Sequence, residues 1–534
     1  MTDDQDAHLD SIEHQPAVQN HFIKQGTTFK KHYCTVALCC PSRVSLLTGK
    51  AAHNTNVTDV SPPHGGYPKF VKEGLNDDYL PVWLQEAGYN TYYTGKLMNT
   101  FSTKTYDKPH PRGWTRSDFL IDPFTYIYNK PATSLDNGPY QVHAGNYSTD
   151  MIADRAVEFL KNALDAEKPF FLGVAPMAPH AELIDEFKEP IPADRHKDLF
   201  PDAKVPRRKN FNPCQPGTAS YFKTLPRLNS TQVKYLDNFQ RRRLQSLQAV
   251  DDLINNLMTV LEDQPEVLEN TYLIYTSDNG YHLGQHRLPP GKSCNIEEDI
   301  NVPFIARGPG IPKGKLVTFP TSHTDVAPTF LQLAGIPLRE DFDGVPIPMT
   351  DDAQDPSTLR SEHVNVEFWK RGFLEGEGFG PIPGFQNENT YKTLRIVADS
   401  YEYIYTVWCI GDHELYDMKA DPFQMKNLYG LQDQHHQNVP QLTKRLDTLL
   451  LTLKNCKASS CQRPWETIFP GGQVRSLQDA MDTSYDDFFS QQPQIAFDEC
   501  TEGYIPELEG PFSPLPYDDF AAFHLQRIRD QYYI

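Results

Sequence analysis

The residues best suited to chemistry stand in the run CCPSRVSLLTG, from Cys39 to Gly49. Pro41 suits the first turn of a helix and Gly49 suits the position just past its end, so the run predicts a short helix with Cys39 just before it. Free N–H groups and the positive dipole end at a helix start attract anions and lower the pKa of a thiol. Arg43, one turn further on, could reach the same place. The alternative is a buried, structural cysteine pair beside an ordinary helix.

Carboxylates and an amide form a second set, with Asp3 and Asp4 at the start of the chain and Asp278 and Asn279 much later. Such oxygen ligands suit a hard cation, Ca²⁺ or Mg²⁺, rather than zinc. Each pair taken alone is more typical of a turn or of a solvated surface. The two pairs indicate a metal site only when they are considered together.

Three cationic or titratable side chains form the third set: Lys96, His180 and Lys292. A lone lysine is usually solvated and a lone histidine is usually structural. However, Lys96, His180 and Asp278 each follow a run that reads as a strand, and open α/β sheets place their ligand crevice beyond the carboxyl ends of the strands. We therefore expect these residues to meet.

The elements that must position these residues alternate between helix and strand. An amphipathic stripe predicts helices, and short β-prone or apolar runs predict strands between them. This alternation predicts an α/β fold with a mostly parallel sheet sandwiched by helices, over residues 1–350. The predicted helices are Tyr79–Ala87, Ser148–Leu164, Thr231–Glu262 and Thr324–Ala334, and the predicted strands are 90–94, Pro169–Val174 and Thr271–Thr276.

The pattern changes near residue 350. Polar and Gly/Pro-rich stretches up to residue 384 predict a loop or linker. Residues 385–465 then predict a smaller α+β domain, with antiparallel strands at Leu394–Val397 and Tyr401–Trp408 followed by a helix at Leu442–Lys454. Residues 466–534 lack periodicity, and we expect an irregular tail packed on the body.

Composition limits the function. The 534 residues hold 50 Lys+Arg against 70 Asp+Glu, a net charge of −20, which argues against a nucleic-acid surface. No stretch approaches 18 apolar residues, so no membrane span is expected. Nine cysteines are an odd number, which leaves at least one unpaired if the others form disulfides. Cys456 and Cys461 either close a small loop or are unrelated thiols. Sequons at Asn56, Asn146 and Asn229 are possible glycosylation sites, although such triplets also arise by chance.

The pattern Cys-x-Pro-Ser-Arg-x-x-x-Leu-Thr-Gly resembles the signature of the type I sulfatases. Its five-residue core would arise by chance in a chain of this length on the order of once in a thousand. The resemblance extends from Asp3 to about Asn427, with a glucosamine-6-sulfatase look in the phrase Ser-Asp-Asn-Gly-Tyr-His. It implies an alkaline-phosphatase-like architecture. It also implies that a formylglycine-generating enzyme oxidises Cys39, not Cys40, to formylglycine, which would make Cys39 the odd cysteine.

The resemblance assigns the remaining roles. It implies one divalent ion, usually Ca²⁺ and less often Mg²⁺, held by Asp3, Asp4, Asp278, Asn279 and the group made from Cys39. Arg43, Lys96 and Lys292 would hold the sulfate or the formylglycine, and His180 would assist the leaving group. The reaction implied is hydrolysis of a sulfate monoester, in which one hydroxyl of the hydrated aldehyde attacks sulfur and the other allows sulfate release.

Two features depart from the family pattern. Met98 stands where many sulfatases carry a histidine, so no second catalytic histidine is assigned. His282 and His286 are nearby candidates, but both have a structural alternative. The alternative functions are glucosamine-6-sulfatase-like action on sulfated glycans, a phosphoesterase of the same superfamily, and an inactive truncated sulfatase.

The N-terminus is the second departure. Met1 is followed at once by Thr2 and Asp3, with no signal peptide. The family places an apolar strand before the two aspartates and a signal peptide before that strand, because the cysteine is modified in the secretory pathway. We therefore expect Met1 to be a truncation or a misplaced start. The expected location is the secretory pathway, the extracellular space or a lysosome- or vacuole-like compartment.

Overall fold

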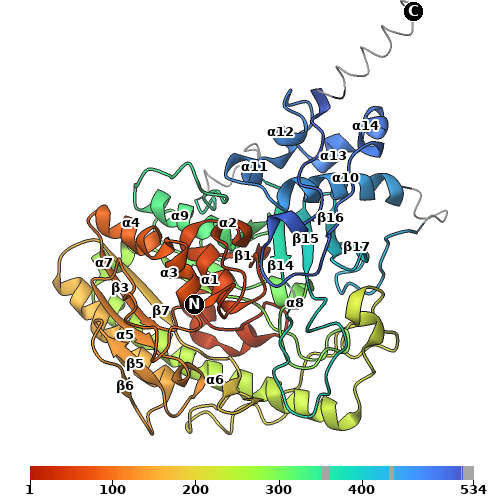
Figure 1. The fold of residues 1–534 in the computed structure, drawn as a ribbon. Coiled ribbons are helices and arrows are strands. Elements are labelled where there is room, and N and C mark those ends of the chain that lie inside the picture. The colour runs from red at the N-terminus through yellow and green to blue at the C-terminus, as the bar shows by residue number, and fades with distance from the viewer. Residues whose placement is uncertain (351–360, 370, 432–437, 519, 521–534) are drawn as a thin grey trace, which may run out of the picture.

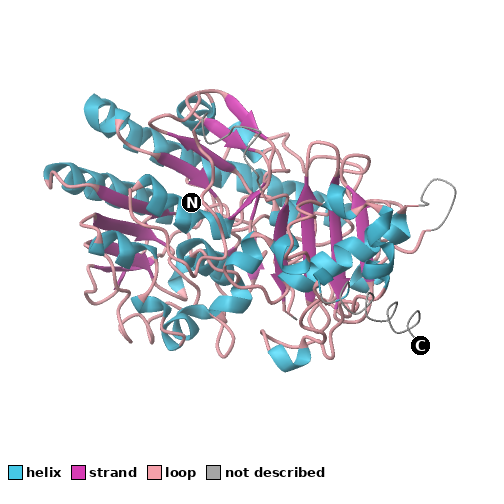
Figure 2. Cartoon of the chain, turned by 90° about the horizontal axis from the view of Figure 1, so that it is seen from above, coloured by secondary structure: helices cyan, strands magenta, loops and turns pink. Residues whose placement is uncertain are grey.

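The computed structural model describes residues 1–350, 361–369, 371–431, 438–518 and 520. The chain forms an α/β body and a C-terminal body built on an antiparallel sheet (Figure 1). Seen from above, the four long strands of the C-terminal body stand beside the α/β body (Figure 2). None of the helices in the described part of the chain has the length and apolar character needed to cross a membrane.

The α/β body contains two mixed sheets rather than one mostly parallel sheet. In the first sheet, of order β6-β5-β4-β3-β7, strand β3 runs parallel to its neighbours β4 and β7, while β4, β5 and β6 pair antiparallel. In the second, of order β10-β11-β1-β12, only β1 and β12 are parallel. The strands are β3 (Asn90–Gly95), β4 (Arg116–Leu120), β5 (Ala132–Leu135), β6 (Gln141–Val142), β7 (Phe170–Ala175), β10 (Leu273–Thr276), β11 (Phe304–Arg307), β1 (Thr27–Phe29) and β12 (Lys315–Val317).

Helices cover both faces of these sheets, as the sequence predicts. Successive strand residues point to opposite faces, and Ile305 packs in the cluster that contains the long helices α5 and α6, while Phe304 and Ala306 pack in the cluster that contains α1, α4 and α9. The helices are α5 (Ser148–Asp165), α6 (Ser230–Glu262), α1 (Cys39–Thr48), α4 (Leu80–Glu86) and α9 (Val326–Leu333). Shorter helices and strands of this body are α2 (Ala52–Thr55), α3 (Gly66–Lys72), α7 (Pro265–Glu269), α8 (Glu297–Ile300), β2 (His32–Tyr33), β8 (Glu182–Leu183), β9 (Phe187–Lys188) and β13 (Thr321–Ser322).

The first two residues of the chain lie between the two sheets. The Met1 amino group donates to the Val174 carbonyl at 2.8 Å, and Thr2 N donates to the Thr276 carbonyl at 2.9 Å. Thr2 and Ser277 form a parallel bridge, so the chain leaves this position in the direction of β7 and β10. Behind Met1, between β7 and β10, lies an apolar slot of about 790 Å³.

The C-terminal body is a four-stranded antiparallel sheet of order β14-β15-β16-β17, with helix α10 packed on one face. The sheet begins ahead of the predicted boundary at residue 385, because β14 occupies part of the expected linker; the expected loop at 351–360 lies outside the described residues. The elements are β14 (His363–Phe368), β15 (Tyr391–Val397), β16 (Glu402–Trp408), β17 (His413–Asp417) and α10 (Val439–Leu453).

The segment predicted as a tail, residues 466–534, packs on this body but is not irregular throughout. Its aromatic side chains, among them Phe469, Phe488 and Phe489, share one apolar core with α10. A disulfide between Cys409 and Cys500, which no sequence feature indicated, ties it to the sheet. The short helices α11 (Ser459–Gln462) and α12 (Pro464–Ile468) lead into it, and it contains α13 (Leu477–Ala480) and α14 (Asp486–Ser490); the part of the predicted tail beyond Phe520 lies outside the described residues.

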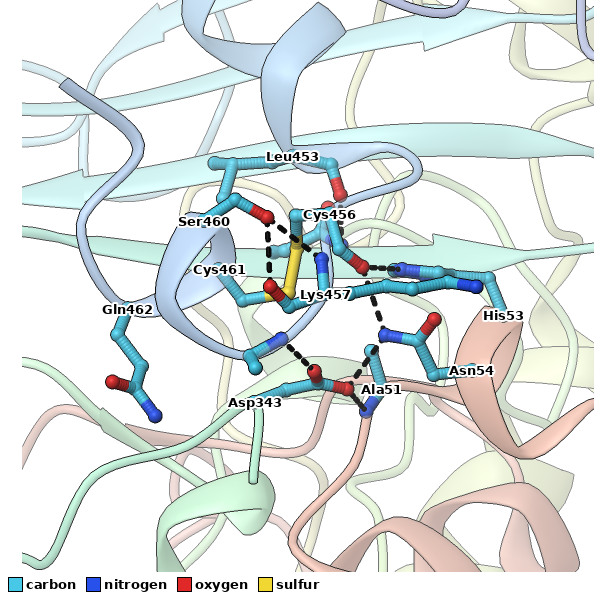
Figure 3. The surroundings of a disulfide bond; sticks show 12 residues. Ala51, His53, Asn54, Asp343, Leu453, Cys456, Lys457, Ser460, Cys461 and Gln462 are labelled. Carbon is cyan, nitrogen blue, oxygen red and sulfur yellow. Dashed lines mark hydrogen bonds between the residues drawn. A yellow bond between two sulfur atoms is a disulfide. The ribbon is translucent and has the colours of Figure 1, made fainter. Parts of the chain in front are cut away.

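The second disulfide, Cys456–Cys461, closes the small loop that the spacing allowed, and this loop makes hydrogen bonds to the α/β body (Figure 3). The Cys456 carbonyl accepts hydrogen bonds from the His53 ring and from the Asn54 amide, both at 2.8 Å. Asp343 accepts from Ala458 N of the loop at 2.7 Å and from Asn54 at 2.7 Å. The loop is thus fastened to the segment that directly follows α1.

Candidate active site

Cys39 is the first residue of α1, whose start is marked by the extended Leu38 and whose end is marked by Gly49 at φ 68°. Its Sγ lies 3.5 Å from Asp3 Oδ1, 3.9 Å from Asp4 Oδ1 and 3.4 Å from Lys292 Nζ. Cys40 instead packs in the apolar core with Phe29 and Val44. Only the first cysteine of the pair therefore faces charged groups.

The expectation of an acidic thiol at this helix start is wrong. Burial raises the pKa of Cys39 well above its ordinary value, and the nearby Lys292 and Lys96 do not offset this. Cys39 is only 2% exposed, so loss of hydration outweighs the helix start and the two lysines. The odd number of cysteines also does not identify Cys39 as the one unpaired cysteine, because five cysteines are free: Cys34, Cys39, Cys40, Cys214 and Cys294.

The four predicted oxygen ligands meet beside Cys39. The parallel pairing of Thr2 with Ser277 brings Asp3 and Asp4 next to Asp278 and Asn279. Asp4 N donates to Asp278 Oδ1 at 3.0 Å, and the Asn279 amide donates to Asp4 Oδ1 at 2.8 Å. All four side chains are fully buried.

Each of the three carboxylates has a cation against it. Lys96 Nζ lies 2.5 Å from Asp3 Oδ2, Lys292 Nζ lies 2.7 Å from both oxygens of Asp4, and Arg43 Nε lies 2.8 Å from Asp278 Oδ2. Burial alone would raise the pKa of Asp3, but Lys96, His180 and Arg43 together lower it to about 2. Burial also acts against the charged form of Asp4, but Lys292 and His180 lower its pKa, so Asp3 and Asp4 stay charged although they are buried.

His180 points its Nε2 toward the same group of residues. Its Nδ1 lies 2.6 Å from the Ala181 carbonyl, which makes Nδ1 the donor and leaves Nε2, 3.6 Å from Asp4 Oδ2, on the site side. The ring packs on Tyr126 with centroids 4.6 Å apart, and Tyr126 also lies under Lys96 Nζ at 4.9 Å. Tyr126 had no signal in the sequence.

The donor set fits a hard divalent cation. Atoms of Asp3, Asp4, Cys39 and His180 lie within 4.8 Å of one another. Asn279 Oδ1 is buried and has no hydrogen-bond partner among the described residues, so it is an acceptor free to ligate. Oxygen-rich, negatively charged donors of this kind suit Ca²⁺ or Mg²⁺.

All nine predicted site residues thus come together, and further residues join them. Glu375 Oε1 lies 3.1 Å from Lys292 Nζ, and Ser42 Oγ lies 2.8 Å from His323 Nδ1. Glu375 was missed because it lies in a Gly/Pro-rich stretch without a motif, and His323 because it is remote in sequence.

The candidate second histidines have structural positions. His282 Nδ1 is held by Asp299 Oδ1 at 2.7 Å, and the His282 backbone pairs with that of Gly291, beside Lys292. Burial lowers the pKa of His286 to about 4, so its ring is neutral at physiological pH. Met98, which stands at the position where the family pattern has a histidine, packs in the apolar core.

Comparison with known sequences matches this chain to sulfatases. The sulfatase family model matches residues 1–336, and the model described as N-sulphoglucosamine sulphohydrolase, C-terminal, matches residues 284–452. Sulfatase ppz1 of Metarhizium majus (strain ARSEF 297) is 54% identical over 399 residues, covering 74% of this chain and 87% of the relative. Arylsulfatase of Volvox carteri is 37% identical, covering 94% and 80%, and N-acetylglucosamine-6-sulfatase of Bos taurus is 32% identical, covering 86% and 83%.

Solved structures show the same fold. A protein in complex with its substrate D-glucosamine-2-N,6-O-disulfate superposes with a TM-score of 0.67 at 24% identity, covering 85% of this chain and 96% of that chain. A phosphonate monoester hydrolase from Silicibacter pomeroyi superposes with a TM-score of 0.60 at 19% identity, covering 86% and 96%. The predicted alkaline-phosphatase-like α/β architecture with a smaller C-terminal domain is confirmed.

Proposed function

The chain belongs to the sulfatase family, whose members hydrolyse sulfate esters, and we propose that it does so with a formylglycine made from Cys39 and with one bound divalent cation, Ca²⁺ rather than Mg²⁺. The observation that carries this proposal is the position of Cys39 Sγ, which lies within 4 Å of Asp3, Asp4 and Lys292, whereas Cys40 lies in the core. The cation would be held by Asp3, Asp4, Asp278, Asn279 and the group at position 39.

The chain's own side chains supply charge and a proton. Arg43, Lys96 and Lys292 stabilise negative charge on the sulfate oxygens. In its protonated form, His180 donates the Nε2 proton to the departing oxygen, while the Nδ1 proton stays on the ring in its hydrogen bond to the Ala181 carbonyl. The cation, when bound, supplies Lewis-acid stabilisation, and the formylglycine, when hydrated, supplies the attacking hydroxyl.

The ligand set of the site argues against a two-zinc phosphatase. Such phosphatases need several histidine ligands, whereas among the described residues His180 is the one histidine in the cluster with Asp3, Asp4 and Cys39.

The two disulfides support maturation in an oxidising compartment, because such bonds are rare in the cytosol. We therefore propose the secretory pathway, with delivery to the extracellular space or to a lysosome- or vacuole-like compartment. There the formylglycine-generating enzyme would meet Cys39.

The test is a Cys39→Ser variant, produced alongside the wild type in a secretory host. The single hydroxyl can take one sulfo group from p-nitrophenyl sulfate but cannot expel it, so we expect at most one p-nitrophenol per enzyme and a stable sulfated protein by mass spectrometry. The Cys40→Ala variant is the matched control and should keep turnover. Tandem mass spectrometry of the wild-type peptide should place the aldehyde on Cys39. Repeated turnover by the Cys39→Ser protein would refute the formylglycine mechanism, and a faster reaction with p-nitrophenyl phosphate would favour the phosphoesterase alternative.

A further inference from the structure

Several buried polar atoms around the candidate active site have no hydrogen-bond partner among the described residues, and two of them lie outside the proposed cation ligands and sulfate-binding cations. One is Glu375 Oε2, on a side chain that is 2% exposed, and the other is the Tyr281 hydroxyl, on a side chain that is fully buried. Buried polar groups are normally paired, because leaving one unpaired is unfavourable. We take this acceptor and this donor as groups that a ligand completes.

Both groups belong to the surroundings of Lys292. Glu375 Oε1 is 3.1 Å from Lys292 Nζ, which leaves the second oxygen of that carboxylate as the free acceptor. Arg243 lies over the Tyr281 ring and donates from Nη2 to the Asp4 carbonyl at 2.7 Å, and Asp4 in turn pairs with Lys292, so Tyr281 lies among the same groups. The Tyr281 ring is fixed between Phe239, with centroids 5.9 Å apart, and Arg243, whose Cζ lies 4.4 Å from the ring centroid.

The backbone holds Glu375 in this position. Glu375 N donates to the Pro290 carbonyl at 2.9 Å, and Leu374 bridges to Gly291, the residue before Lys292. A side chain at Gly376 would come within 2.8 Å of the Pro290 ring, so the two segments approach as closely as they can. Glu375 is therefore built into the site by the same contacts that place Lys292.

A free acceptor and a free donor together match one kind of chemical group. A hydroxyl can donate to Glu375 Oε2 and accept from the Tyr281 hydroxyl, whereas an aromatic ring can do neither through its edge. We propose that Glu375 and Tyr281 form a subsite for a substrate hydroxyl near the sulfate ester, so that the enzyme selects sulfated sugars over aryl sulfates. This inference rests on the proposed sulfatase activity and names its substrate class.

The experiment compares two primary alkyl sulfates that differ only in hydroxyl groups on a six-membered ring: glucose 6-sulfate and cyclohexylmethyl sulfate. We expect Tyr281→Phe and Glu375→Gln to lower kcat/KM for glucose 6-sulfate by about 10- to 100-fold, the value of a hydrogen bond to a charged or buried partner. With cyclohexylmethyl sulfate, kcat/KM should change less than about threefold for Tyr281→Phe. The matched control is Tyr235→Phe, whose hydroxyl accepts from Glu377 N at 3.2 Å on the same segment and should leave the ratio of the two substrates unchanged.

Folding is checked by thermal melting. The Tyr281→Phe change removes an oxygen that bonds to no described residue, so the midpoint should not fall. Equal losses on both substrates would overturn the subsite and leave Glu375 as a support for Lys292, and no loss on either would show that water alone fills it. If the wild type hydrolyses neither sulfate nor p-nitrophenyl sulfate, the proposed activity itself has failed.

Discussion

The candidate active site and the core of the C-terminal body bury carboxylates in opposite settings. At the site, burial would raise the pKa of Asp3, but Lys96 and its other cationic neighbours hold it at about 2. In the C-terminal body, Asp447 accepts from the Tyr405 hydroxyl and from Ile495 N, and burial raises its pKa to about 6. Burial would also raise the pKa of Glu367 of β14, but His53 of the α/β body and Lys392 lower it to about 2. A buried carboxyl therefore keeps its charge where cationic side chains face it, and ionisation is disfavoured where its partners are neutral.

The two bodies also differ in how their sheets are completed. In the C-terminal body each strand from β14 to β17 pairs along most of its length, and α10 covers one face. In the α/β body, the space between β7 and β10 has two different ends. The charged site lies at the carboxyl ends of these strands, and the apolar slot lies toward their amino ends. Met1 and Thr2 thus lie between the charged site and the apolar slot.

The largest expected effect on activity comes from removing one charge from the site at the carboxyl ends of β7 and β10. Asp4→Asn should lower kcat/KM for p-nitrophenyl sulfate by at least about 100-fold, because it removes a charged cation ligand and one of the two carboxylates that pair with Lys292. Added CaCl₂ should raise the thermal midpoint of the wild type, since a ligand that binds only the folded state stabilises it, and this rise should vanish in Asp4→Asn.

The matched control is Asp6→Asn, two residues further on. Asp6 is also buried, but it accepts from the backbone of His8 and Leu9 and lies beside Arg243, not beside Cys39. Its calcium-dependent rise in midpoint should persist. If calcium still stabilised Asp4→Asn as strongly as the wild type, the cation site would lie elsewhere.

The next effect is on stability and concerns the apolar slot toward the amino ends of β7 and β10. Met1 N bonds to β7 and Thr2 bonds to β10, so a strand continuing backward from Met1 would run parallel to both and fill the slot. We predict that five apolar, β-branched residues added before Met1 raise the free energy of unfolding by a few kcal/mol. Each buried side chain contributes about 1.5–3 kcal/mol, and ordering the chain offsets much of it.

A polar Gly/Ser/Asn segment of equal length is the control for that extension. It has no apolar surface to bury, so its unfolding midpoint should match that of the chain starting at Met1. Equal midpoints for the apolar and polar extensions would show that the slot does not take a strand.

The sequence predicts the fold class and which of the candidate residues lie close together, for physical reasons. Lys96, His180 and Asp278 follow strands, and strand ends meet at a sheet edge, so their meeting could be expected. The pKa of Cys39 could not, because it depends on burial that only the packed structure sets. Tyr281 and Glu375 carry no local pattern; they matter only because both lack partners once folded.

The smallest effect tests the neutral setting in the C-terminal body. Since the pKa of Asp447 is raised from 3.8 to about 6 in the folded state, the folded protein binds more protons than the unfolded chain between these values, and stability is lost as pH rises from about 4 to 6. Asp447→Asn cannot ionise. Its single amide oxygen can accept from Ile495 N, and its NH₂ group can donate to the Tyr405 hydroxyl, which also faces His413 Nδ1. Relative to the wild type, its free energy of unfolding should therefore improve by about 2–3 kcal/mol between pH 4 and pH 7, measured by urea unfolding. A constant difference between variant and wild type across that range would mean that Asp447 is as readily ionised as a solvated carboxyl, and the contrast between the two bodies would then rest on packing alone.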